Sequence, residues 1–129
     1  MSVKTEGLTE SDVILYEADK RYSREVVTIL SGAGALEVGA VLGKVTASKK
    51  YIPSPAAEVT GSEGAETATA VLLERVDATS ADAEAVVLMR HALVNRSNLS
   101  FATSVSDATK RQAKIDQLAA VGIISRQGA

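Results

Sequence analysis

His91 is the side chain best suited to acid–base or metal chemistry in this sequence, and it is the only histidine. It lies in the mostly apolar stretch 88–93 (LMRHAL). A catalytic histidine needs a nucleophile beside it and a third group that orients the ring, and no Gly-x-Ser-x-Gly nucleophile turn accompanies it. A metal site needs further ligands, and the sequence holds neither a second His nor any Cys. We therefore interpret His91 as a structural or interface residue, and predict no catalytic residue, no metal ligand and no cofactor.

Two glycine-rich segments have part of the spacing that binds phosphate groups. Residues 39–45 (GAVLGKV) follow the phosphate-loop pattern of nucleotide-binding proteins, but they are one residue short between the glycines. Val45 also stands where a hydroxyl residue would hold magnesium. Gly32-Ala33-Gly34 lacks the third glycine of a dinucleotide-binding turn. Bends or bulges in a small sheet explain these glycines better.

The acidic residues do not form a recognisable site. Asp77, Asp82 and Glu84 lack the alternating spacing and central glycine of a calcium loop, so we interpret them as part of a solvated turn. Glu63 and Glu66 belong to a polar loop, and no spacing supports a pair of catalytic carboxylates. These patterns favour a binding or structural protein over an enzyme.

The elements that must position these residues are mostly short strands. β-branched and aliphatic residues predict strands at 26–30, 36–38, 41–46, 49–52, 68–76, 85–94 and 99–102. Pro53 and Pro55 end one strand, because proline lacks the N–H group that a sheet requires. The segment 53–67 is then a long loop, rich in small and polar residues.

The C-terminal part has a different pattern. Ser106 or Asp107 can cap a helix over 108–121. Ile115, Leu118 and Ala119 have the spacing of one buried helix face, and we expect Lys110, Arg111 and Lys114 on the remaining surface. Gly122 fits a left-handed helix end, and Ile123-Ile124 fits a short strand that returns to the sheet.

The order of many short strands, one helix and a last short strand predicts a β-rich α+β fold. We expect a small curved sheet or partial β-barrel with one C-terminal helix and a flexible N-terminal arm. The arm covers residues 1–22 and the domain covers residues 23–129. Residues 1–22 are mostly polar and contain one apolar patch, Val13–Tyr16. Such a short segment is either poorly ordered alone or a terminal strand packed on the domain, and the sequence leaves both open.

Composition narrows the class of protein. The chain has 129 residues, enough for one domain, and 46% of them are hydrophobic although only 3% are aromatic. Ala and Val supply 21 and 15 residues, so small side chains must fill most of the core. The absence of Cys excludes disulfides and fits a reducing compartment. The net charge of −2 argues against a direct nucleic-acid partner, and no apolar run is long enough for a membrane span.

Several blocks in the central region resemble one protein family. These are Arg24 with Val26-Val27-Thr28-Ile29, then Gly34, Leu36, Gly39-Ala40-Val41-Leu42-Gly43 and Val45-Thr46, then Tyr51, Gly61-Ser62, 68–73, 76–79, 85–94 and the helix followed by Gly122-Ile123-Ile124. Their order and spacing resemble the phage head decoration proteins, the lambda-type proteins that stabilise capsids. The resemblance covers about residues 22–126.

The resemblance implies a homotrimer on the outer surface of the expanded phage head, assembled in the host cytoplasm. It would sit at three-fold and quasi-three-fold positions, and it would clamp subunits of the major capsid protein against the pressure of packaged DNA. Members of the family use an N-terminal arm to bind the capsid. The candidate here is residues 6–16, with Val13, Ile14, Leu15 and Tyr16 as apolar anchors. Such an arm can add a strand to an exposed sheet edge, and three arms on one trimer gain avidity.

Two other functions stay open at this point. A virion module that binds host cells or glycans would use exposed loops such as 53–64, although the four aromatic residues offer few sugar platforms. A small enzyme or ligand carrier would need groups that converge on His91, and no local pattern suggests them.

Overall fold

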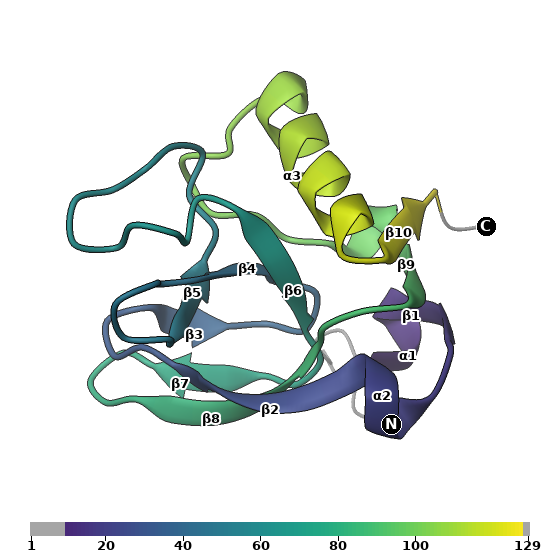
Figure 1. Cartoon of the computed structure of the whole chain (residues 1–129), viewed down its shortest axis with the longest axis horizontal. Helices are drawn as coiled ribbons and strands as arrows, with labels where there is room; N and C mark the ends of the chain where they lie inside the picture. Colours follow the sequence, from purple (N-terminus) through teal and green to yellow (C-terminus); the bar gives the residue numbers. More distant parts are fainter. Residues whose placement is uncertain (1–9, 128–129) are drawn as a thin grey trace, which may run out of the picture.

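The computed structural model describes residues 10–127 and has a β-rich fold with one main helix near the C-terminus (Figure 1). The described helices are α1 (Glu10–Val13), α2 (Lys20–Ser23), the 3-10 helix η1 (Arg96–Asn98) and α3 (Ala108–Ala120). The described strands are β1 (Ile14–Glu17), β2 (Arg24–Ile29), β3 (Gly34–Leu36), β4 (Val41–Lys44), β5 (Tyr51–Pro53), β6 (Ala68–Leu72), β7 (Val76–Ala78), β8 (Ala83–Leu88), β9 (Ala92–Asn95) and β10 (Ile123–Arg126).

A closed barrel forms the centre of the fold, with strand order β2-β5-β4-β6-β8. The predicted small curved sheet is therefore confirmed, and it closes completely. A bulge between Leu42 and Gly43 bends β4 where it pairs with β6. A Cβ atom on Gly43 would lie 2.0 Å from the carbonyl oxygen of Ala65, so only glycine fits there. The interpretation of the glycines as sheet bends is correct at this position.

A separate three-stranded sheet lies at one end of the barrel, with strand order β1-β9-β10. Strand β1 pairs antiparallel with β9, and β10 pairs parallel with β9. Helix α3 packs against β10 and β6, so it connects this sheet to the barrel (Figure 1). Strands β3 and β7 form a further two-stranded sheet.

The predicted strand over 85–94 is wrong in one respect, because the chain turns within it. Strand β8 belongs to the barrel and β9 to the three-stranded sheet, and His91 between them has a φ of 51°. The predicted strand over 68–76 is likewise divided between β6 and β7. A continuous apolar run shows that a segment is buried, but it does not show where the chain passes from one sheet to another. Of the predicted strand 99–102, only Ser100 forms a bridge, with Ala40.

Helix α3 begins and ends as expected. Asp107 is its N-cap, with a side-chain oxygen that accepts from the backbone N–H of Lys110 at 2.8 Å. Gly122 follows the helix with a φ of 85°, in the left-handed region. Leu118 is fully buried as predicted, but Ala119 is exposed and Ile115 is only half-buried.

The prediction for Lys114 is wrong, because its side chain is 1% exposed. Its Nζ donates to Ser54 Oγ at 3.0 Å and to Gln117 Oε1 at 3.4 Å, and it also contacts the carbonyl oxygen of Glu66. These three acceptors satisfy a buried ammonium group, and two of them belong to the long loop 53–67. Lys114 therefore joins α3 to both ends of that loop.

Small residues fill the interior. The two core clusters consist almost entirely of Ala, Val, Leu and Ile, and Tyr51 is the one aromatic residue that the described core holds. The composition predicted such packing, and the structure confirms it. Tyr16 and Tyr22 are instead exposed, with 63% and 49% of their surface accessible.

The structure describes only the second part of the segment 1–22, which was predicted as an arm. Residues 1–9 lie outside them. From residue 10 onwards the chain packs on the domain: Val13 is fully buried in a core cluster and β1 is paired with β9. Of the two alternatives left open for residues 1–22, the structure has the packed terminal strand over Ile14–Glu17. Within residues 10–127, no helix is long and apolar enough to cross a membrane.

Candidate interaction surface

The four residues predicted as capsid-binding anchors lie in different environments. Val13 is fully buried and Ile14 packs against the same core cluster. Leu15 and Tyr16 are exposed, with 46% and 63% of their surface accessible. A bulge between Ile14 and Tyr16 interrupts the pairing of β1 with β9 and places Leu15 outside the regular ladder. The structure therefore brings only Leu15 and Tyr16 to the surface.

Tyr16 belongs to an apolar row that crosses the three-stranded sheet. The strand registers place Tyr16 opposite Leu93, and Leu93 opposite Ile124. Ile124 has 47% of its surface exposed, whereas its strand neighbours Ile123 and Ser125 are buried. Successive side chains of a strand point to opposite faces, so these three side chains share the outward face of the sheet. We call Tyr16, Leu93 and Ile124 the outer row.

The outer row borders a shallow hollow of about 420 Å³, also lined by Ala18, His91 and Arg126. Sequence reasoning missed Leu93 and Ile124. Alternation along the predicted strand at 123–124 already required one of its two isoleucines to point outward, but only the strand order shows that it meets Tyr16.

His91 occupies a corner between the barrel and this sheet. Its carbonyl oxygen accepts from the backbone N–H of Ala18 at 3.1 Å and from Ser23 Oγ at 3.3 Å. Its ring lies edge-on to Tyr22, with 5.0 Å between ring centroids. A Cβ on Gly122 would lie 2.9 Å from the His91 ring, so glycine is needed for this close approach. These contacts agree with the interpretation of His91 as a structural or interface residue.

Ion pairs surround this corner. Arg90 lies over the Tyr22 ring, 5.2 Å from its centroid, and contacts the carboxylate of Glu25. Arg24 and Glu17 form a two-point pair at 2.7 and 3.0 Å, which is mostly buried and joins β1 to β2. The edge strand β1 is thus held to the barrel by charge as well as by Val13.

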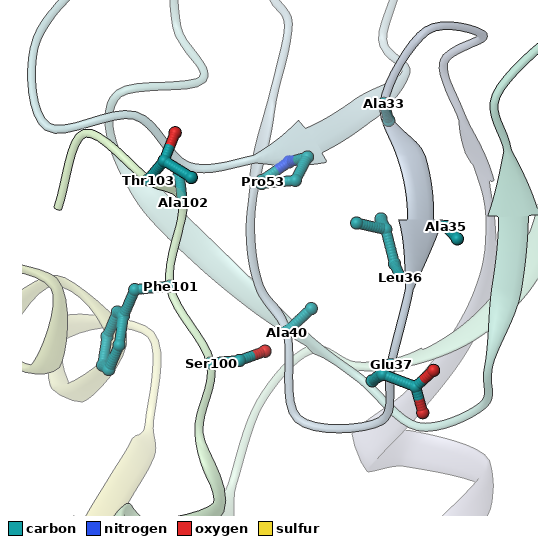
Figure 2. A pocket seen from close by; sticks show the side chains of 10 residues that line it. All are labelled: Ala33, Ala35, Leu36, Glu37, Ala40, Pro53, Ser100, Phe101, Ala102 and Thr103. Carbon is teal, nitrogen blue, oxygen red and sulfur yellow. The ribbon is translucent and has the colours of Figure 1, made fainter. Parts of the chain in front are cut away.

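A second hollow, of about 410 Å³, lies between β3 and the segment 100–103 (Figure 2). Small residues, among them Ala33, Ala40 and Ala102, line most of it. Glu37 is the one charged residue of its lining, and its carboxylate accepts from Arg75 Nε at 2.9 Å. Figure 2 shows the Phe101 ring turned away from the space between the walls. The lining offers contact surface and no pair of groups for acid–base work.

The predicted acidic cluster stabilises turns. Asp77 accepts from the Thr79 hydroxyl at 2.5 Å and from the backbone N–H of Thr79 at 3.0 Å, and these two bonds lower the pKa of Asp77. Lys50 and the backbone N–H of Ser31 lower the pKa of Asp82. Within residues 10–127, no group of three or more His, Asp or Glu side chains is placed to hold a metal ion. The expectation of a solvated turn fits these contacts.

Comparison with protein-family models matches residues 3–123 to the bacteriophage lambda head decoration protein D family. The chain belongs to this family. The match covers nearly the whole sequence, including residues on every strand of the barrel and of the three-stranded sheet. A search of curated proteins found no match.

Membership of the head decoration family indicates where the outer row would be used, because the family acts on the phage capsid. The family is a structural component of the phage capsid, so this chain has a structural role on the capsid. The resemblance seen in the sequence is therefore confirmed. An exposed apolar face on such a protein is a candidate contact with other capsid components.

Proposed function

We propose that this protein is a homotrimer that binds the outer surface of the expanded phage head at three-fold and quasi-three-fold positions. It clamps neighbouring subunits of the major capsid protein and stabilises the DNA-filled capsid. The observation that carries this proposal is the family match over residues 3–123. The exposed outer row supports it, and so does the exposed Tyr22 beside His91, because two of the four aromatic residues of the chain, Tyr16 and Tyr22, are displayed at one end of the molecule.

The proposed contact with the capsid protein begins at β1. This strand lies at an edge of its sheet, with β9 on one side. An edge strand has backbone N–H and C=O groups that can pair with an added strand. Leu15 and Tyr16 supply exposed side chains for the contact, and Val13 and Ile14 fix the strand to the core. In this proposal, residues 1–9 extend the same contact along the capsid surface.

Trimerisation strengthens a contact of this size. One short strand and a few side chains bind weakly, because they bury little surface. Three such contacts on one trimer make the later ones intramolecular, which raises avidity by roughly 10²–10⁴ when the spacing fits. An expanded shell can present three sites at that spacing where an unexpanded shell does not.

Sedimentation with purified heads tests the proposal. Undecorated expanded heads and unexpanded heads are each mixed with the full-length protein. We expect co-sedimentation with expanded heads only, at about three copies for each local three-fold position. A protein that binds neither form, or that binds host cells without heads, would overturn the proposal.

A truncated variant locates the contact. Deletion of residues 1–9 leaves Val13 and β1 in place, whereas a longer deletion through Tyr16 would remove core and sheet residues. We expect the shorter variant to keep its circular dichroism spectrum and to lose affinity for heads. Unchanged affinity would show that β1 and the outer row suffice.

A further inference from the structure

Two arginines line a third hollow, of about 320 Å³, between the start of α3 and the segment that precedes it. Arg96 comes from η1 and Arg111 from α3, and apolar side chains, including those of Leu99, Phe101 and Ile115, complete much of the wall. No carboxylate belongs to this lining. The hollow thus combines two guanidinium groups with an apolar wall.

Neither arginine has an acidic partner in the part of the chain that the structure describes. The guanidinium of Arg96 donates to Ser125 Oγ at 3.0 Å and to Ser125 O at 3.1 Å. By contrast, Arg24, Arg75 and Arg90 each form an ion pair with a glutamate.

The nearest acidic residues of α3 are engaged elsewhere. Asp107 accepts from the backbone N–H of Lys110 at 2.8 Å, and Asp116 accepts from Gln112 Nε2 at 2.9 Å. Two like charges that line one hollow repel each other, and an anion bound between them would offset that repulsion. The hollow therefore complements a negatively charged group.

We infer that this hollow binds an acidic side chain of the major capsid protein, with its carboxylate on Arg96 and Arg111 and its carbon chain against Phe101 and Ile115. This inference rests on the proposed function for the identity of the partner. Guanidinium groups suit the task, because the planar donors of Arg111 match the two oxygens of a carboxylate. Arg96, whose Nε and Nη2 donate to Ser125, adds its Nη1 donor and its charge. The apolar wall removes water from one side of the pair and so strengthens it. The surface with which this protein binds the capsid then includes this hollow as well as β1 and the outer row.

Charge reversal on α3 tests the inference in the full-length protein with expanded heads. Arg111→Glu should weaken head binding at least about 10-fold at low salt, because it places a carboxylate opposite a carboxylate. The loss should shrink in 0.5 M NaCl, where exposed charges are screened. Arg111→Lys should retain part of the affinity. Lys110→Glu is the matched control, since it makes the same change of charge one residue away and outside the hollow.

A second measurement does not need heads. N-acetylglutamate is titrated into the ¹⁵N-labelled protein, and we expect shifts confined to the backbone around Arg96, Leu99 and Phe101 and to the Arg111 side chain. Equal effects of Arg111→Glu and Lys110→Glu on head binding would overturn the inference, as would unchanged binding by Arg111→Glu. If the wild-type protein does not bind heads but shows these shifts, the proposed function fails and the carboxylate site stands.

Discussion

At the scale of single residues, Lys114 shows how a charged side chain becomes part of a core. Three oxygen acceptors surround its Nζ, and two of them come from the loop 53–67. Burial nevertheless lowers the pKa of Lys114 below its usual value of 10.5, although the charge of Glu66 opposes this effect. The hydrogen bonds satisfy the ammonium group without repaying all of its lost hydration.

This balance predicts the pH dependence of stability. Because the pKa of Lys114 is lower in the folded chain, the unfolded chain binds the Lys114 proton more readily than the folded chain does. Below the folded-state pKa, the buried ammonium group is charged and its full cost reduces the free energy of unfolding. That cost is relieved as the pH rises through the lowered pKa towards 10.5. We expect the free energy of unfolding of the wild type to rise relative to that of Lys114→Met between pH 7 and pH 10. Urea unfolding of both proteins at the two pH values measures the difference, and a constant difference would contradict the prediction.

Gly43 gives a second prediction at this scale. A Cβ there would lie 2.0 Å from the Ala65 carbonyl oxygen, so Gly43→Ala should destabilise the fold by about 3 kcal/mol through steric overlap. Gly32→Ala is the control, because Gly32 has a φ of 91° but no atom within 4 Å of the added Cβ. Gly32→Ala therefore introduces backbone strain without steric overlap, and this strain costs about 1 kcal/mol. Thermal and urea unfolding distinguish the two, and equal losses would show that the overlap at Gly43 relaxes.

At the scale of secondary structure, the three-stranded sheet is the element to which we assign the proposed capsid contact. Val13 and the Glu17–Arg24 pair hold β1 against the barrel, and β9 and β10 extend its outward face. The outer row exists only because the strand order brings β1 and β10 to opposite sides of β9. The residues of the outer row are far apart in the sequence, so the surface depends on this pairing.

Ile124→Thr tests the outer row without disturbing the strand. Threonine keeps the branched side chain that strands favour and removes apolar surface, so we expect stability to change little and head binding to fall several-fold. Val26→Thr is the matched control, because Val26 is another exposed β-branched residue, with 63% of its surface accessible, on the barrel strand β2. Sedimentation with expanded heads compares the two variants. Equal binding by both would exclude the outer row as a capsid contact.

At the scale of the whole molecule, the proposed binding to several capsid subunits would stabilise the shell by mass action. A ligand that binds only the intact shell shifts the equilibrium away from the ruptured one, and the shift grows with occupancy. We therefore expect heads filled with DNA to release it at a higher temperature when decorated. Dye fluorescence during heating measures the release. Heads mixed with Ile124→Thr at the same concentration should show a smaller increase, and equal release temperatures with and without the wild-type protein would contradict the proposed role.

The sequence by itself determined the fold class, the positions of most strands, both ends of α3 and the family. These depend on local patterns: alternation along strands, the Asp107 cap, the left-handed Gly122, and blocks of residues in a set order. Only the tertiary structure decided that the sheet closes into a barrel, that the chain turns at His91 and that Lys114 is buried. It also decided that Tyr16, Leu93 and Ile124 form one row and that Arg96 and Arg111 line one hollow. Each of these features depends on contacts between residues distant in sequence, and a local pattern carries no information about which distant residues will meet.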